Sequence, residues 1–169
     1  LGGATTVTTN NGNISFSSTL NNGQTLSLTA GTGAVTITGA TGGTTALTSL
    51  TASGNTIAVN NVRTTGTQSY TGTTSTTLNG TSYLTAGGTF GVTGPALLGT
   101  GATIDTTNSG GTPAGANISF STTINNAQTL SLVGGTAGAI TVSGIVGGTT
   151  ALTSFTANAN TISTVGVRT

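Results

Sequence analysis

The sequence of 169 residues contains almost no side chain that carries catalytic or metal-binding chemistry. It has no cysteine, histidine, lysine, glutamate, methionine or tryptophan, and its charged residues are Arg63, Asp105 and Arg168. General acid–base catalysis needs a pair of titratable groups, and transition-metal sites need clustered histidines, cysteines or carboxylates. Carbohydrate cleavage likewise needs two carboxylates. We therefore expect a protein with no enzymatic activity, no metal, no cofactor and no disulfide.

The shortage of charge and of long apolar runs excludes two further classes of partner. The formal net charge is +1 and no basic stretch is interleaved with aromatic residues, so we expect no binding to nucleic acid. No apolar run approaches the ~18 residues of a membrane-spanning helix, so we expect no membrane insertion of this segment. The chain begins with neither methionine nor a signal-like segment, and we expect Leu1 to be an internal or processed start.

The residues that are abundant are those that form β-strands and turns. Threonine is the commonest residue and outnumbers the 29 glycines, while 33% of the residues are hydrophobic. That apolar content is too high for a typical disordered, low-complexity segment. No apolar spacing of 3.6 residues survives the glycine and β-branched content, so the sequence predicts an all-β fold.

A long internal repeat organises the chain. Residues 13–32 (NISFSSTLNNGQTLSLTAGT) match residues 117–136 (NISFSTTINNAQTLSLVGGT) at an offset of 104. After a one-residue insertion the match continues at an offset of 105, pairing residues 35–57 with 140–162 and residues 62–64 with 167–169. Apolar positions stay apolar between the copies, as a buried face requires.

A shorter period lies inside the long repeat. Strand-like segments open at Asn13, Val35, Thr56, Thr76, Ala96 and Asn117, at spacings of 20 to 22 residues. Such a period predicts a parallel β-helix (β-solenoid) with about 20–22 residues per turn and roughly eight turns. We interpret residues 1–169 as a single β-solenoid section of a longer array, with a partial turn at 1–12, a first copy of five turns at 13–116 and a second, partial copy at 117–169.

Alternation within the strand-like segments assigns the predicted interior and the predicted corners. Asparagine pairs at the corners are expected to tolerate left-handed backbone and to stack as amide ladders between turns. The candidate ladder residues are Asn21, Asn22, Asn60, Asn61, Asn125 and Asn126. The candidate core residues are Ile14, Phe16, Leu26, Leu28, Val35, Ile37, Ile57, Val59, Ile118, Phe120, Leu130, Leu132, Ile140 and Val142.

Several phrases of the sequence carry a family resemblance. GNISFSSTLNNGQTLSLTAGTG, GGTTALTSLTASGNTI and NVRTTGTQSYTG resemble the repeat arrays of large secreted bacterial surface proteins of the filamentous-haemagglutinin and autotransporter-adhesin type. The resemblance covers essentially the whole chain. It implies a right-handed solenoid, export to the cell surface, and a role as a non-enzymatic stalk, fibre or adhesin that associates with itself or with neighbouring repeats of the same chain.

Other features leave alternatives open. Outward threonines, as at Thr25 and Thr36, are typical of any solvated strand, but they also resemble the faces of ice-binding solenoids, although the rows break at Ala58 and Ser163. A ligand-binding adhesin for host or surface glycans is a further alternative. Arg63 and Arg168 occupy the same place in each copy and fit either exposed charges or a lateral contact between rods. We do not expect Asp105, beside the glycine-rich insert at 109–116, to bind calcium, because no second carboxylate exists.

Overall fold

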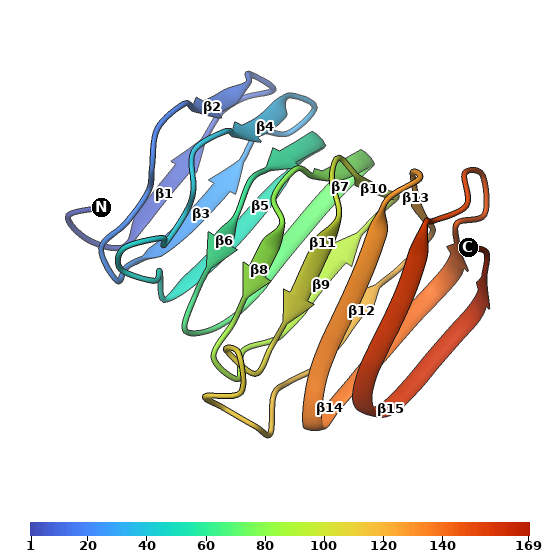
Figure 1. The fold of residues 1–169 in the computed structure, drawn as a ribbon. Helices are drawn as coiled ribbons and strands as arrows, with labels where there is room; N and C mark the ends of the chain where they lie inside the picture. Colours follow the sequence, from blue (N-terminus) through green and yellow to red (C-terminus); the bar gives the residue numbers. More distant parts are fainter.

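The computed structural model describes all residues 1–169, and it confirms the prediction of a parallel β-helix. The chain winds as a solenoid from the N-terminus at one end to the C-terminus at the other (Figure 1). It contains no helix, and all named strands pair in parallel. The strands are β1 (Thr5–Thr8), β2 (Ile14–Phe16), β3 (Thr25–Thr29), β4 (Ala34–Ile37), β5 (Ser49–Val59), β6 (Val62–Arg63), β7 (Gln68–Leu78), β8 (Ser82–Leu84), β9 (Phe90–Thr93), β10 (Ala96–Leu98), β11 (Ala102–Asp105), β12 (Ile118–Phe120), β13 (Ile124–Asn125), β14 (Thr129–Val146) and β15 (Ser154–Val167).

The strands stack in three parallel ladders, one for each side of the coil. Long strands such as β5 and β7 bend at a corner and belong to two ladders. The chain makes seven full turns and most of an eighth. The first ladder runs through Thr5, Leu26, Leu50, Gln68, Phe90, Ile118, Ile140 and Ile162; the second through Ile14, Val35, Ile57, Thr76, Ala96, Ile124, Val146 and Val167; the third through Leu20, Thr41, Val62, Tyr83, Ile104, Leu132 and Ala157.

The interior follows the alternation of apolar and polar residues. In β3 and β4 each inward residue is buried and its neighbours are less so, because successive side chains of a strand point to opposite faces. The structure buries all the candidate core residues except Phe16, which is partly buried and packs against the core. Stacking of turns buries these side chains against equivalent side chains above and below, which a single turn could not do.

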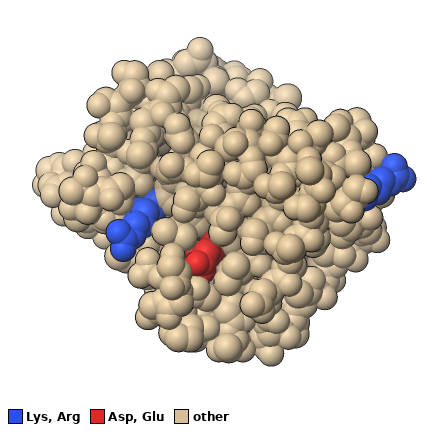
Figure 2. Space-filling view, in the orientation of Figure 1, with Lys and Arg blue, Asp and Glu red and all other residues tan.

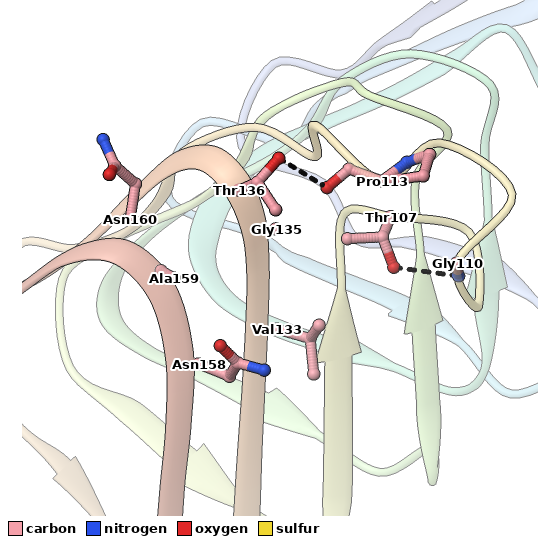
Figure 3. A pocket seen from close by; sticks show the side chains of 9 residues that line it. All are labelled: Thr107, Gly110, Pro113, Val133, Gly135, Thr136, Asn158, Ala159 and Asn160. Atoms are coloured by element: carbon pink, nitrogen blue, oxygen red, sulfur yellow. Dashed lines mark hydrogen bonds between the residues drawn. The ribbon is translucent and has the colours of Figure 1, made fainter.

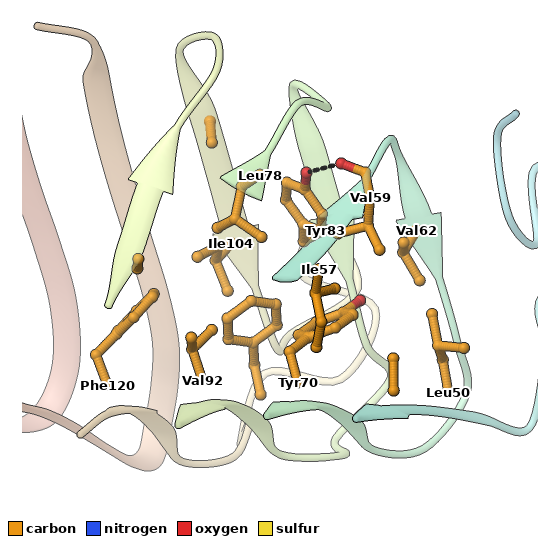
Figure 4. Close-up of a cluster of buried hydrophobic side chains, with 14 of the residues drawn as sticks. Leu50, Ile57, Val59, Val62, Tyr70, Leu78, Tyr83, Val92, Ile104 and Phe120 are labelled. Atoms are coloured by element: carbon orange, nitrogen blue, oxygen red, sulfur yellow. Dashed lines mark hydrogen bonds between the residues drawn. The ribbon is translucent and has the colours of Figure 1, made fainter. Parts of the chain in front are cut away.

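Aromatic residues fill the middle of the core, and the sequence interpretation did not include three of them. Tyr70, Tyr83 and Phe90 are fully buried, and Phe90 lies with its ring centroid 5.7 Å from Tyr70 and 6.0 Å from Tyr83. Phe120 continues the cluster at 5.9 Å from Phe90. Figure 4 shows this cluster between the ladders, with the Tyr83 hydroxyl donating to the Val59 carbonyl at 3.0 Å. Such pairs add about 0.5–1.5 kcal/mol each beyond the area they bury.

One turn is longer than the others. The pairing Phe90↔Ile118 spans 28 residues, whereas Ile14↔Val35 and Ile118↔Ile140 span 21 and 22. The extra residues lie in the loop between β11 and β12. In the first turn the Thr9 hydroxyl closes the equivalent loop on Gly12, three residues away, but the Thr106 hydroxyl closes it on Ala116, ten residues away. The loop therefore contains a seven-residue insertion, Ser109–Gly115.

This insertion overturns the predicted phase of the second copy. Four turns along the second ladder lead from Ile14 to Ala96, but Ala96 pairs with Ile124. After Ala96 the chain passes the third ladder at Ile104 and then reaches the first ladder at Ile118. Ile118 is the counterpart of Ile14, and it pairs with Phe90. The prediction that Asn117 opens the turn after Ala96 is wrong, and one copy occupies four and two-thirds turns in place of five.

Counterparts in the two copies consequently lie on different sides of the solenoid. Ile14 is on the second ladder and Ile118 on the first; Leu26 is on the first and Leu130 on the third. The second copy is rotated by one ladder, about 120°, relative to the first. Three such copies would bring identical residues back to the same side.

Candidate functional site

The two ends of the solenoid are open sheet edges. β1 pairs with β3 alone, and β15 pairs with β14 alone. At the C-terminal end, β15 leaves Ile162 49%, Val165 67% and Val167 42% exposed. These are the large hydrophobic side chains that the molecule exposes most. A strand with one unpaired edge and exposed apolar side chains is a template for pairing with further strands.

Asparagines join adjacent turns, but not in the predicted way. The Oδ1 of Asn21 accepts hydrogen bonds from the backbone N–H of Thr44 at 3.0 Å and of Thr45 at 3.3 Å. In the second copy, Asn125 Oδ1 accepts from Thr149 at 2.8 Å and Thr150 at 3.4 Å. No hydrogen bond joins two asparagine side chains, so the predicted amide ladders are wrong. The candidates Asn22, Asn60, Asn61 and Asn126 also bond to backbone groups, mostly of a neighbouring turn.

The left-handed backbone expected at these corners occurs at part of them. Asn22 has φ 107° and Asn126 has φ 88°, whereas Asn60 and Asn61 do not adopt a positive φ. Sequence reasoning missed further asparagines of the same kind. Asn13 Oδ1 accepts from Ala34 N–H and its counterpart Asn117 from Ala139 N–H, both at 2.9 Å. Their position just before an identical strand in both copies was the available signal.

The outward side of the first ladder carries hydroxyl groups in register. The central outward row reads Thr, Ser, Thr, Ser, Gly, Ser, Thr, Ser along the axis. A flanking row begins Thr, Thr, Ser, Thr, Thr. Neighbouring turns lie ~4.8 Å apart, and the two rows are roughly 6.7 Å apart along the strands. We call this surface the hydroxyl face; its central row is Thr6, Ser27, Thr51, Ser69, Gly91, Ser119, Thr141 and Ser163, and its flanking row is Thr8, Thr29, Ser53, Thr71 and Thr93.

The second ladder has no hydroxyl row of comparable length. Its outward residues include Thr36 and Thr77, but Ala58 and Leu97 interrupt them. Ala58 and Ser163 were expected to break one threonine array, yet they lie on different ladders. Ser163 retains a hydroxyl on the hydroxyl face, so of the two expected breaks only Ala58 interrupts a row of hydroxyls.

The single acidic residue organises the inserted loop. Asp105 is buried; its Oδ1 accepts from the N–H and the hydroxyl of Thr107, both at 2.6 Å, and its Oδ2 accepts from the Ser109 N–H at 2.9 Å. No group of three or more histidines, cysteines or carboxylates lies together anywhere in the chain. The carboxylate therefore serves as an acceptor for loop donors.

A groove lies between the inserted loop and the last two turns. Its volume is about 510 Å³, and Thr107, Pro113 and Thr136 line one part of it. Asn158 and Asn160 from β15 form the opposite part, and all of its lining residues are uncharged. Figure 3 shows the Thr136 hydroxyl bonded to the Pro113 carbonyl at the rim, with both asparagines across the groove. The asparagine wall belongs to the open edge of β15.

The two arginines share a local environment but not a side of the molecule. The Arg63 carbonyl accepts from Leu47 N–H at 3.1 Å, and the Arg168 carbonyl accepts from Leu152 N–H at 3.0 Å. Arg63 follows Val62 on the third ladder, whereas Arg168 follows Val167 on the second. Figure 2 shows the two basic side chains far apart, with the acidic side chain between them. The two arginines therefore occupy the same place in the repeat, as expected, but they lie on different sides of the solenoid.

Burial raises the pKa of the two tyrosines. Tyr70 has a pKa well above its ordinary value because it is fully buried, with Tyr83 nearby as a second cause. Burial also raises the pKa of Tyr83, although a hydrogen bond from the Gly80 N–H opposes the shift. Both side chains are therefore neutral structural groups at physiological pH.

Comparison with family models, with curated proteins and with solved structures gave no significant match. The resemblance to adhesin repeat arrays accordingly stays an expectation from the sequence. The chain contains no helix of the length and hydrophobicity that crossing a membrane requires.

Proposed function

We propose that this chain is a non-enzymatic structural protein that forms the shaft, or a building block of the shaft, of an extracellular fibre or adhesin on a bacterial surface. The observation that carries the proposal is the continuous stack of parallel turns, in which β1 and β15 each pair on one side alone. A stack of this kind can be lengthened by adding turns, because each turn contacts its neighbours alone. Its partners in this role are neighbouring turns of the same kind.

The chemistry of the surface supports a passive role outside the cell. Two arginines and no lysine leave few sites for trypsin-like proteases, and ladder-paired backbone is poorly accessible to them. The nearly uncharged sides offer little repulsion against lateral bundling. The sequence resemblance to secreted surface-protein repeats favours the same location.

Electron microscopy of the native surface material, labelled with antibodies against this chain, tests the proposal. We expect label at regular intervals along filaments many times longer than the ~34 Å that seven steps of ~4.8 Å between turns would span. Isolated rods of about that length, or label confined to the cytoplasm, would contradict it.

A second candidate function rests on the hydroxyl face. Its rows of threonine and serine hydroxyls, interrupted at Gly91, lie in register on one side of the solenoid, and such an array could bind ice or a polyhydroxylated glycan. Thermal-hysteresis and glycan-array measurements on the intact chain separate this candidate from a pure shaft, which should give no signal in either assay. Thr51→Leu and Thr141→Leu in the central row should abolish any signal, whereas Thr36→Leu on the second ladder should leave it intact.

A further inference from the structure

The C-terminal edge repeats a surface that is buried under another turn elsewhere in the molecule. Strand β15 and the residues after it, 154–169, are the counterparts of residues 49–64 at an offset of 105. In the first copy, β7 and β8 lie against that surface and bury it. The interior of the protein therefore displays what fits the exposed end.

Exposure of matched side chains shows how much of the surface lacks a cover. Ile57 is 1% exposed and its counterpart Ile162 49%; Val62 is 2% exposed and Val167 42%. The identities are the same, and the difference is the turn at residues 65–84 that lies beside the first pair. A turn of that kind would bury the second pair in the same way.

Polar groups at the C-terminal edge also lack hydrogen-bond partners that their counterparts in the first copy have. Asn55 Oδ1 accepts from the hydroxyls of Thr73 at 3.2 Å and Thr74 at 2.6 Å in the covering turn. Its counterpart Asn160 is exposed and has a neighbouring turn only on the β14 side. The amide oxygen of Asn160 is thus placed to accept from a pair of hydroxyls.

Backbone carbonyl groups at the C-terminal edge also have counterparts that accept hydrogen bonds in the first copy. In the first copy the Leu47 and Thr48 carbonyls accept from the N–H groups of Thr65 at 2.7 Å and Gly66 at 2.8 Å. The Val62 carbonyl accepts from Gln68 Nε2 at 3.3 Å. The counterparts of these acceptors are the carbonyls of Leu152, Thr153 and Val167.

We propose that the C-terminal edge binds a solenoid turn with the side-chain pattern of residues 65–84: a buried glutamine, two inward tyrosines and a pair of threonine hydroxyls at the corner. The inference deepens the proposed shaft role and rests on it for its biological meaning. It specifies the neighbour by chemistry, since the turn must present Gln68, Tyr70 and Tyr83 to the ladders and Thr73–Thr74 to Asn160.

The N-terminal turn of another copy does not have this pattern. Strands β1 and β2 correspond to β11 and β12, since Val7 pairs with Leu28 as Ile104 pairs with Leu132, and Ile14 is the counterpart of Ile118. On their other side, β11 and β12 contact β8 and β9. The N-terminal edge therefore fits a turn like residues 82–98, which is not what the C-terminal end offers. Direct head-to-tail stacking would leave both edges poorly matched.

Seven of the sixteen matched positions differ, and four of the differences are consecutive at one corner, residues 58–61. Val59, Asn60 and Asn61 are replaced by Thr164, Val165 and Gly166. Asn61 Oδ1 accepts from the Ser82 N–H at 3.0 Å, and glycine cannot provide that acceptor. The bound turn is accordingly held more weakly at this corner than β7 and β8 are held in the first copy.

Appending a second copy of residues 65–84 after Thr169 tests the inference in the full chain. We expect the amides of Phe155–Val167 to gain at least about 100-fold protection against hydrogen exchange, as residues that move from an edge to an interior do. We expect the melting temperature to rise by about 5 °C or more. Adding Thr164→Val, Val165→Asn and Gly166→Asn to the extended chain should raise protection further.

Two matched extensions serve as controls. One appends residues 1–20 and the other appends residues 65–84 in shuffled order; neither should protect β15 beyond about tenfold. Equal protection by residues 1–20 would overturn the inference in favour of head-to-tail stacking, and no protection by residues 65–84 would overturn it outright. Neither result depends on whether the native protein forms fibres, so the shaft proposal stands or fails separately.

Discussion

Residues 13–64 and 117–169 are two similar sequences that occupy different sides of one solenoid. Their contacts between turns agree closely: Asn21 binds Thr44 N–H at 3.0 Å, and Asn125 binds Thr149 N–H at 2.8 Å. Their ladders do not agree, because the second copy is rotated by one ladder. The difference shows that each sequence specifies its relation to the next turn, and that the side it occupies depends on how many ladder steps precede it.

Rotation also gives matched residues different neighbours. Phe16 on the second ladder pairs with Ile37 near the N-terminal end and is partly buried. Phe120 on the first ladder lies between Val92 and Val142, is fully buried, and contacts the Phe90 ring. The same local sequence is therefore expected to contribute unequally to the free energy of unfolding in the two copies.

The largest expected effect separates these two phenylalanines. Phe120→Ala removes a fully buried ring from the aromatic cluster and should lower the free energy of unfolding by about 3–5 kcal/mol. Phe16→Ala, in the same sequence context, should cost about half as much or less, because part of the ring is already in water. Urea denaturation followed by far-UV circular dichroism measures both; equal losses would contradict the assigned ladders.

Alkaline pH should act on the part of the first copy that has no counterpart in the second, residues 65–116, where both tyrosines lie. Below about pH 10 the tyrosines are protonated in the folded and unfolded states, so stability is constant with respect to them. Above that pH the unfolded chain ionises first, because burial holds the pKa of Tyr70 and Tyr83 higher in the folded state. Stability should then fall by about 1.4 kcal/mol per tyrosine for each pH unit.

Urea denaturation at pH 9 and pH 11 measures this loss. Tyr83→Phe should roughly halve the difference between the two pH values, since one of the two titrating groups is removed. An unchanged stability at pH 11 would show that the tyrosines are not buried as the structure has them.

Thr8 and Asp105 occupy equivalent corners of the solenoid, but only the corner at Asp105 is followed by the inserted loop. Asp105→Ala removes the acceptor of three hydrogen bonds and leaves the N–H groups of Thr107 and Ser109 without it. A loss of about 1.5–3 kcal/mol follows from hydrogen bonds to a charged acceptor. Thr8→Ala, at the matched ladder position, is exposed and should change stability by at most about 0.5 kcal/mol. Thermal and urea unfolding of the two variants would contradict this account if the losses were equal.

The smallest expected difference concerns the matched asparagines. Asn21→Ala and Asn125→Ala each remove an acceptor for two backbone N–H groups, and each should cost about 1 kcal/mol. The costs should agree within about 0.5 kcal/mol although the residues lie on different ladders. Denaturation of the two single variants measures the comparison, and a large difference would show that the side of the solenoid matters to these contacts.

Much of the fold could be predicted from the sequence because its determinants are local. Alternation at Leu26–Leu28 and Val35–Ile37 gave the strands and their inward faces, and the internal repeat gave the coil. The aromatic centre at Tyr70, Tyr83 and Phe90 lies where the repeat has no second copy for comparison. Without that comparison its residues were not assigned to the interior.

The phase of the second copy could not be predicted from spacing. Ala96 and Asn117 are 21 residues apart, which equals one ordinary turn, so the longer turn of 28 residues was hidden. The amide ladders failed for a related reason: Leu20 pairs with Thr41, which places Gly42, not an asparagine, beside Asn21. Which residue lies above another depends on turn lengths summed along the chain, and local patterns do not contain that sum.

The rotation of the copies is the central claim, and a pair of engineered disulfides tests it directly in this cysteine-free chain. The structure places Ser119 beside Gly91, where an added Cβ would lie 3.3 Å from Ser119 Oγ. A repeat of five whole turns would instead place Ser119 beside Leu97. Neighbouring parallel strands ~4.8 Å apart lie within the Cα separation that a disulfide accepts. Under mild oxidation the Gly91→Cys/Ser119→Cys chain should form the intramolecular bond and the Leu97→Cys/Ser119→Cys chain should not; the reverse result would contradict the account.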